Sequence, residues 1–274
     1  MITGLSIGVI IGLVLGLTGA GGSVFAVPML ILLLDLPVDQ AVGIALGVVS
    51  ISALFGTISN WQGKYILWIP ALLLGLCGAV LTPAGRQLGT QLSANIVMLG
   101  FSVLAISIAA LMWRQAARSP ERSTVVRANG GSGDQDYIEP ICRFNDSSRF
   151  NLSASCIAAL LASGIVVGIL SGLFGVGGGF LIVPTLVFVA QVSMRQAVAT
   201  SLLIITLISG AGFFSFAQNN VLDWQLLSYV CIGGLFGMLA GRLMASKIAG
   251  AQLEKIFALS LVAVTLTTLV RQLG

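Results

Sequence analysis

The sequence predicts an all-α polytopic membrane protein built from two homologous halves. Three observations indicate this fold class. Hydrophobic residues make up 57% of the 274 residues, charged residues make up only 8%, and the mean hydropathy is +1.05. The apolar runs approach the roughly 20 residues that span a bilayer core. The chain also repeats itself at an offset of 156 residues. A soluble domain carries about 25% charged residues, so this chain has too few to cover a surface in water.

The repeat is clearest around two glycine clusters. Residues 16–30 read GLTGAGGSVFAVPML and residues 172–186 read GLFGVGGGFLIVPTL, with identity at eight of the fifteen positions. The same offset aligns Trp68 with Trp224, and Gly85-Arg86 with Gly241-Arg242. Internal duplication of this kind is common among secondary transporters.

Each half is expected to contain three full transmembrane helices after a region that its glycine cluster interrupts. The expected spans are 40–60, 64–85 and 94–113 in the first half, and 195–217, 224–245 and 252–271 in the second. The interrupted regions are 2–34 and 154–190. Residues 114–151 contain six arginines and read as a polar cytoplasmic linker. The sequence therefore divides into a first repeat (1–113), a linker (114–151) and a second repeat (152–274).

The orientation of the halves depends on how each interrupted region crosses the membrane. A broken single span makes the halves parallel, whereas a hairpin makes them inverted. With a cytoplasmic linker, parallel halves place eight basic residues inside and five outside. Inverted halves place eleven inside and leave only Arg86 and Arg271 outside. Basic residues favour the cytoplasmic side, so inverted repeats are expected.

Glycines recur at every fourth position before each cluster, at Gly4, Gly8, Gly12 and Gly16 and again at Gly164, Gly168 and Gly172. This spacing puts bare backbone along one helix face, where another helix can approach closely. The face could serve the bundle of one chain or a homodimer.

The glycine clusters are candidate binding sites for a small anion. Irregular backbone at membrane depth is tolerated only inside protein or beside a cavity. A helix that restarts near Ser23 would expose unpaired N–H groups and the positive end of its dipole. A tight turn or close packing would also explain glycine there. The candidate substrate-binding residues are Thr18, Gly19, Gly21, Gly22, Ser23, Gly175, Gly177, Gly178 and Gly179, with Pro28 and Pro184 as hinges.

Four other polar residues at matching positions are candidates for the same site. Arg86 and Arg242 each follow a glycine, and a buried arginine in a membrane needs an anionic partner or substrate. Both could equally extend to the membrane surface from a helix end. Gln40 and Gln196 could offer neutral donors to an anion or cap a helix.

The residue types exclude several function classes. The chain has no histidine, and its four cysteines form no CxxC pair, so we expect no metal site, no catalytic residues and no cofactor. The net charge of +4 forms no aromatic-interleaved patch, so nucleic acid is not an expected partner. The expected partners are the lipid bilayer and a small anionic substrate.

The sequence resembles the sulfite exporter family TauE/SafE over its whole length. The strongest marks are GAGGSVFAVPML and GVGGGFLIVPTL. The resemblance implies an integral carrier of sulfite, sulfoacetate or other sulfur-containing anions. It also implies that Gly19, Gly21, Gly22, Pro28, Gly175, Gly177, Gly178 and Pro184 are signature positions.

The predicted function is export of such an anion across the bacterial inner membrane by alternating access around the glycine breaks. Coupling to protons or to the membrane potential is expected. A passive anion channel and a permease for another small anion are the alternatives. Neither the substrate nor the direction of transport follows from the residues.

Overall fold

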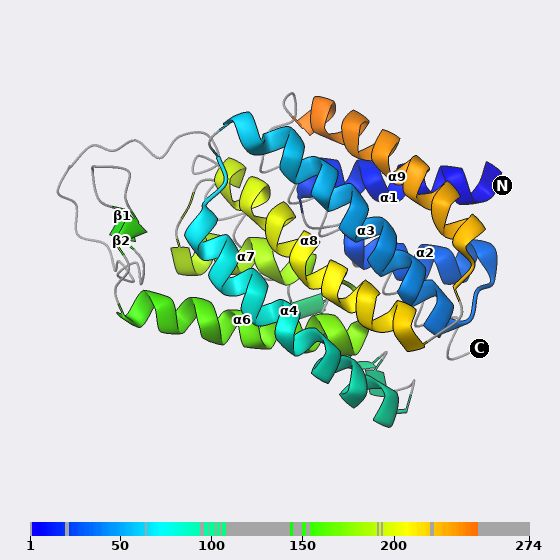
Figure 1. Ribbon diagram of the computed structural model, residues 1–274, viewed down its shortest axis with the longest axis horizontal. Coiled ribbons are helices and arrows are strands. Elements are labelled where there is room, and N and C mark those ends of the chain that lie inside the picture. The colour runs from blue at the N-terminus through cyan, green and yellow to red at the C-terminus, as the bar shows by residue number, and fades with distance from the viewer. Residues whose placement is uncertain are drawn as a thin grey trace.

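A computed structural model gives the architecture of the chain (Figure 1). The structure describes residues 2–19, 22–63, 65–93, 96–97, 99–101, 103–104, 106–107, 143–144, 150–151, 154–190, 192, 194–219 and 222–245. Gly21, most of the linker and the expected span over 252–271 lie outside these residues. Five helices among them are long and apolar enough to cross a membrane.

The described helices and strands follow one another along the chain as α1 (Ile2–Thr18), α2 (Gly22–Leu34), α3 (Val38–Asn60), the 3-10 turn η1 (Trp61–Gly63), α4 (Trp68–Gln91), β1 (Arg143–Phe144), β2 (Phe150–Asn151), α6 (Ala154–Phe174), α7 (Gly179–Ala190), α8 (Met194–Asn219) and α9 (Trp224–Ala245). The two short strands pair antiparallel within the linker, apart from the helices (Figure 1). The other described residues of both repeats lie in helices or in the short loops between them, and residues 96–97, 99–101, 103–104 and 106–107 are helical.

Local sequence explains several helix boundaries. Pro37 precedes α3, and the Asp223 carboxylate caps α9 by accepting hydrogen bonds from the N–H groups of Gln225 and Leu226 at 3.0 Å. Pro28 and Pro184 lie inside α2 and α7. The chain therefore breaks at the glycines, and each proline removes one hydrogen bond within the short helix that follows.

The glycine face of α1 packs on α9, which comes from the other half (Figure 1). Gly8 lies on the backbone of Val230, and Gly12 lies on that of Gly234. The contacts advance in the same order along both helices, so α1 and α9 are parallel. A stripe of small residues allows this approach of two backbones.

The pair α4 and α6 repeats this arrangement with the halves exchanged. Gly164 lies on the backbone of Leu74, and Gly168 lies on that of Gly78. These contacts are the repeat equivalents of those between α1 and α9. Gly164 is the equivalent of Gly8, and Leu74 is the equivalent of Val230. The glycine faces of α1 and α6 are thus occupied within a single chain.

The central pair is α3 and α8, which occupy equivalent places in the two halves. Gly43 lies on the ring of Phe216, whereas Gly56 lies on Leu202, so the two helices are antiparallel. Near their middle, the Ser50 hydroxyl donates a 3.4 Å hydrogen bond to the carbonyl of Thr206, its own repeat equivalent. Buried Val, Ile and Ala side chains of α3 and α8 form the core around this crossing.

Replacing Gly168 with alanine is expected to destabilise the α4–α6 contact. The new Cβ would lie 2.6 Å from the Cα of Gly78 and 2.9 Å from its carbonyl carbon. Overpacking at such a contact costs about 1–3 kcal/mol. Thermal unfolding in detergent should therefore show a lowered midpoint. Gly100→Ala is the control, because a Cβ there meets only ring atoms of Phe174 at 3.7 Å. Equal midpoints for the two variants would contradict the backbone contact.

Candidate functional site

A loop of glycines joins α6 to α7 in the second half. Gly175, Gly177 and Gly178 have positive φ angles of 66°, 72° and 66°. A side chain in this region costs about 1–2 kcal/mol per residue, which only glycine avoids. Residues 175–179 are all buried. We call residues 175–178 the second glycine loop.

The second glycine loop reaches the middle of the bundle. Gly177 lies directly on the hydroxyl of Ser209 in α8, and its Cβ position is 3.7 Å from Val49 Cγ1 in α3. Val49 is the central residue of α3. Gly178 packs on Val167 and Ser171 of α6, where a Cβ would lie at 2.9 Å and 3.2 Å. The loop backbone is therefore enclosed by α3, α6 and α8.

The hydrogen bonds of the loop leave donors free at the start of α7. The Gly175 N–H donates to the Ser171 carbonyl at 2.9 Å, and the Leu181 N–H donates to the Gly178 carbonyl at 3.0 Å. No hydrogen bond among the described residues uses the N–H of Gly177 or Gly178. These groups and the positive end of the α7 dipole favour an anion.

Two serine hydroxyls beside the loop have no partner among the described residues. Ser171 and Ser209 are 1% and 0% exposed, and neither Oγ makes a hydrogen bond. Buried hydroxyls normally find a partner. Those of Thr57 and Thr82, for example, donate to carbonyls of their own helices at 2.9 Å and 2.8 Å.

Arg86 of α4 lies between the loop and one end of the bundle. Its guanidinium lies over the ring of Phe216, 4.3 Å from the centroid. Its Nη1 is buried and has no hydrogen-bond partner in the described part of the chain. The carboxylate of Asp39, in the first turn of α3, stabilises its charge electrostatically. Phe216 follows Ser209 by two helical turns of α8, or about 10 Å along the axis.

The first glycine cluster matches the second at Gly19, but Gly22 lacks the positive φ of its equivalent Gly178. Gly19 has a φ of 68°, and its carbonyl accepts a 2.9 Å hydrogen bond from the Ser201 hydroxyl. Gly22 begins α2 one residue before the expected start at Ser23. Leu15 and Ala53, both 0% exposed, occupy the places that Ser171 and Ser209 hold in the second half. The side chains of Thr18 and Ser23 lie outside the description.

The remaining predicted residues do not gather in one place. Arg242 is half-buried in the last turn of α9, and Gly16 packs against its backbone. The contacts of α4 with α8 advance in the same order along both helices, and so do those of α9 with α3. Because α3 and α8 are antiparallel, Arg86 and Arg242 lie toward opposite ends of the bundle. Gln40 is exposed near the start of α3, and Gln196 is half-buried near the start of α8.

The predicted site residues do not include Ser171, Ser209 or Phe216, although Ser209 is one of the hydroxyls that recur along its apolar span. Hydroxyls in membrane helices are common, and most bond within their own helix, so single serines stand out little. The repeat itself held a signal, because both serines align with apolar residues of the first half.

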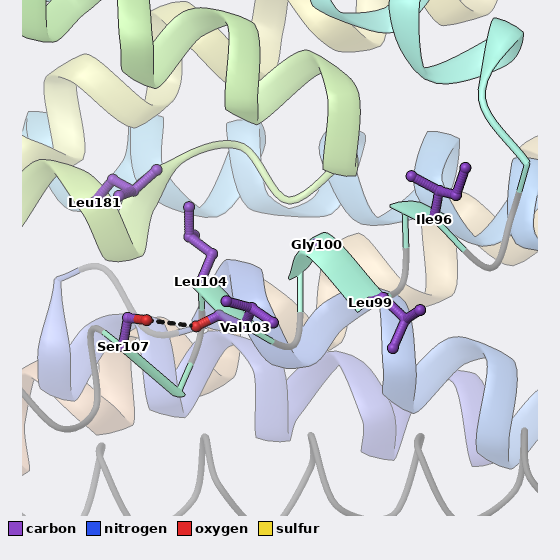
Figure 2. Close-up of a pocket in the computed structure, with 7 residues that line it drawn as sticks. All are labelled: Ile96, Leu99, Gly100, Val103, Leu104, Ser107 and Leu181. Atoms are coloured by element: carbon purple, nitrogen blue, oxygen red, sulfur yellow. Dashed lines mark hydrogen bonds between the residues drawn. The ribbon is translucent and has the colours of Figure 1, made fainter.

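An apolar pocket of about 650 Å³ lies between residues 96–107 and α7 (Figure 2). Leu181 lines it from the first turn of α7. Ser107 also lines the pocket, and its hydroxyl already donates a hydrogen bond to the Val103 carbonyl at 2.7 Å, as Figure 2 shows. This lining offers no free donor to an anion. Among the described residues, no three His, Cys, Asp or Glu side chains form a group that could hold a metal ion.

Comparison with known proteins adds a family match and several relatives. The model of the family described as "Sulfite exporter TauE/SafE" matches residues 4–268. A "Probable membrane transporter protein" of Xylella fastidiosa is 28% identical, covering 94% of this chain and 91% of the relative. YdhB of Bacillus subtilis, also called a probable membrane transporter protein, is 26% identical over 85% of each chain. MJ0441 of Methanocaldococcus jannaschii has the same description and is 28% identical, over 78% of this chain and 71% of its own.

Proposed function

Because this chain belongs to the sulfite exporter TauE/SafE family, and is thus a multi-pass membrane transporter and not an enzyme, we propose that it exports small sulfur-containing anions. Sulfite and organosulfonates such as sulfoacetate are the proposed substrates, and the bacterial inner membrane is the proposed location. The observation that carries the proposal is the second glycine loop. It offers unpaired N–H groups and a helix N-terminus at the middle of α3 and α8.

The electrostatics of this region suit an anion. The nearest neighbours of Gly175, Gly177 and Gly178 include no acidic side chain. Arg86 lies on the way from the loop to one end of the bundle, and its Nη1 has no partner in the described residues. A half-buried guanidinium with one buried, unpartnered nitrogen attracts anions more strongly than one in water. We place the substrate path between Arg86 and the second glycine loop.

The proposed mechanism is alternating access between inverted repeats. The antiparallel crossing of the equivalent helices α3 and α8 supports inversion, because parallel repeats would align them in the same direction. The exchange of partners between α1–α9 and α6–α4 supports a two-fold relation between the halves. Rocking of one pair against the other would open the loop to each side in turn.

The membrane potential is the proposed driving force. It contributes about 2.3 kcal/mol per elementary charge per 100 mV, and a negative interior favours exit of an anion. Coupling to protons is the alternative driving force.

Proteoliposomes containing the purified protein test the proposed substrate. Uptake of labelled sulfite, sulfoacetate and taurine is measured, with chloride as the control and with unlabelled anions as competitors. Saturable uptake of one sulfur anion, competed by the others and not by chloride, is expected. Equal, unsaturable passage of chloride would favour a passive channel.

The inverted arrangement predicts that equivalent residues lie on opposite sides of the membrane. Ile69 and Gln225 are exposed equivalents in the first turns of α4 and α9, each beside an exposed tryptophan of the kind found at membrane interfaces. Ile69→Cys and Gln225→Cys are made separately, with the free cysteines Cys77 and Cys231 replaced by alanine. A membrane-impermeant maleimide should label only one variant in intact cells, and both in permeabilised cells. Equal labelling of the two variants in intact cells would mean parallel halves.

A further inference from the structure

Three buried hydroxyls in the described residues lack a hydrogen-bond partner, and two of them border the second glycine loop. The third, Ser52, lies against Gly234 in the contact between α3 and α9. Ser171 and Ser209 come from helices on different sides of the loop, α6 and α8. A buried hydroxyl without a partner is costly, so a pair of them at one place needs an explanation.

The position of Gly177 explains how the Ser209 hydroxyl reaches the loop. The Oγ occupies the space that a Cβ at residue 177 would fill. On the neighbouring turn, the Ser171 Cβ lies 3.2 Å from the Cβ position of Gly178. The two hydroxyls therefore flank the same pair of glycines, whose N–H groups are also free of described partners.

This group of hydroxyls and backbone N–H groups can supply several hydrogen-bond donors at one place. Each hydroxyl can donate one hydrogen bond, and each backbone N–H can donate another. The three nearest neighbours of each of these glycines include neither an acidic nor a basic side chain. Several converging neutral donors suit the three oxygens of an SO3-type head group, which sulfite and sulfonates share. Hydrogen bonds to such a charged acceptor are stronger than those between neutral groups.

The described part of the first half does not repeat this pair of hydroxyls. Its two equivalent positions carry Leu15 and Ala53, whose side chains are fully buried and cannot donate. Gly22 there packs on the Leu15 side chain and on the Ile11 carbonyl, which is 2.6 Å from the Cβ position. The positive φ of Gly175 recurs at Gly19, but neither the positive φ of Gly178 nor the hydroxyl pair recurs among the described residues of the first half.

We infer that Ser171 and Ser209 bind the substrate by donating hydrogen bonds to its SO3-type head group at the second glycine loop, and that each chain has a single such site. This inference rests on the proposed transport of sulfur anions. It assigns binding to residues outside the repeated glycine signature, and it makes the two halves unequal in function. The first half then provides a matching scaffold without a binding site.

The test uses Ser171→Ala, Ser209→Ala and the double variant in proteoliposomes, with labelled sulfite as the probe. Each lost hydrogen bond to a charged acceptor should raise KM by about tenfold or more, and the double variant should show a larger rise. Because neither hydroxyl has a partner among the described residues, its removal should leave the unfolding midpoint without sulfite unchanged or raised. The stabilisation by added sulfite should shrink in each variant.

Ser163→Ala is the matched control. Ser163 lies on α6 like Ser171, but its hydroxyl donates to the Ala159 carbonyl at 2.8 Å. It should keep the wild-type KM. Ala53→Ser, which places a hydroxyl in the first half, should also leave KM unchanged.

The possible results distinguish the role of the two serines from the proposed transport of sulfur anions. Saturable sulfite flux with the wild-type KM in the double variant would overturn the role of the serines and leave the transport proposal standing. Absence of saturable flux for every sulfur anion in folded wild-type protein would overturn the transport proposal itself. A lowered midpoint without sulfite, together with an unchanged KM, would mean that the hydroxyls are structural.

Discussion

Gly178→Ala should abolish flux of sulfur anions while the protein still inserts and folds. Gly178 has a φ of 66°, so alanine would be strained there by about 1–2 kcal/mol. Its Cβ would also lie 2.9 Å from Val167 Cγ1 and 3.2 Å from Ser171 Cβ. The loop must shift to relieve both, which moves the free N–H groups and the start of α7. A site built from backbone cannot compensate for such a shift, so flux at saturating substrate should fall by at least about a hundredfold.

Two glycine variants serve as comparisons for Gly178→Ala. Gly100→Ala has room for its methyl group and should transport normally. Gly22→Ala alters the equivalent position in the first half, where α2 would be pushed from α1 but no hydroxyl pair is disturbed. Gly22→Ala should therefore lower flux less than Gly178→Ala does. Normal flux for both Gly22→Ala and Gly178→Ala would refute a binding site made of loop backbone.

Arg86→Gln should weaken transport by about ten- to a hundredfold at low substrate concentration. The guanidinium lies over Phe216, and one of its nitrogens is buried without a partner among the described residues. The Asp39 carboxylate interacts with it electrostatically. Loss of this charge removes the attraction that brings an anion toward the second glycine loop, and an interaction of a few kcal/mol corresponds to this range. Initial flux is measured against substrate concentration, at low and high ionic strength.

Two further arginine variants sharpen this test. Arg86→Lys keeps the charge but loses the planar stacking over Phe216, so it should retain part of the flux. Arg242→Gln alters the repeat equivalent toward the other end of the bundle and should have a smaller effect, since Leu15 and Ala53 stand in the first half where the second has the hydroxyl pair. An Arg86→Gln protein with wild-type flux at low substrate would exclude Arg86 from the path.

The helices and their breaks could be predicted largely from sequence. The expected span 40–60 corresponds to α3 at Val38–Asn60, and the expected restart near Ser23 corresponds to α2 beginning at Gly22. Apolar runs and glycine clusters are local signals, and helix formation in a membrane follows them directly. The span expected at 64–85 starts later, at Trp68, and continues to Gln91, because Pro83 and Arg86 do not end the helix.

The sequence could not predict which helix packs against which. The glycine stripe of α1 indicates a face for close packing, but not that its partner is α9 of the other half. A homodimer would have used the same face equally well. The contact of Arg86 with Phe216 and the position of Ser209 on Gly177 also depend on how α3, α4 and α8 are placed in space. Such long-range contacts are fixed by the packed bundle rather than by local pattern.

Counterflow of sulfite is the most direct test of a carrier that alternates around the second glycine loop. Proteoliposomes are loaded with unlabelled sulfite and diluted into a trace of labelled sulfite. The account predicts transient accumulation of label that depends on internal sulfite, is absent with internal chloride and is lost in Gly178→Ala. Label uptake that ignores internal sulfite, or that persists unchanged in Gly178→Ala, would contradict it.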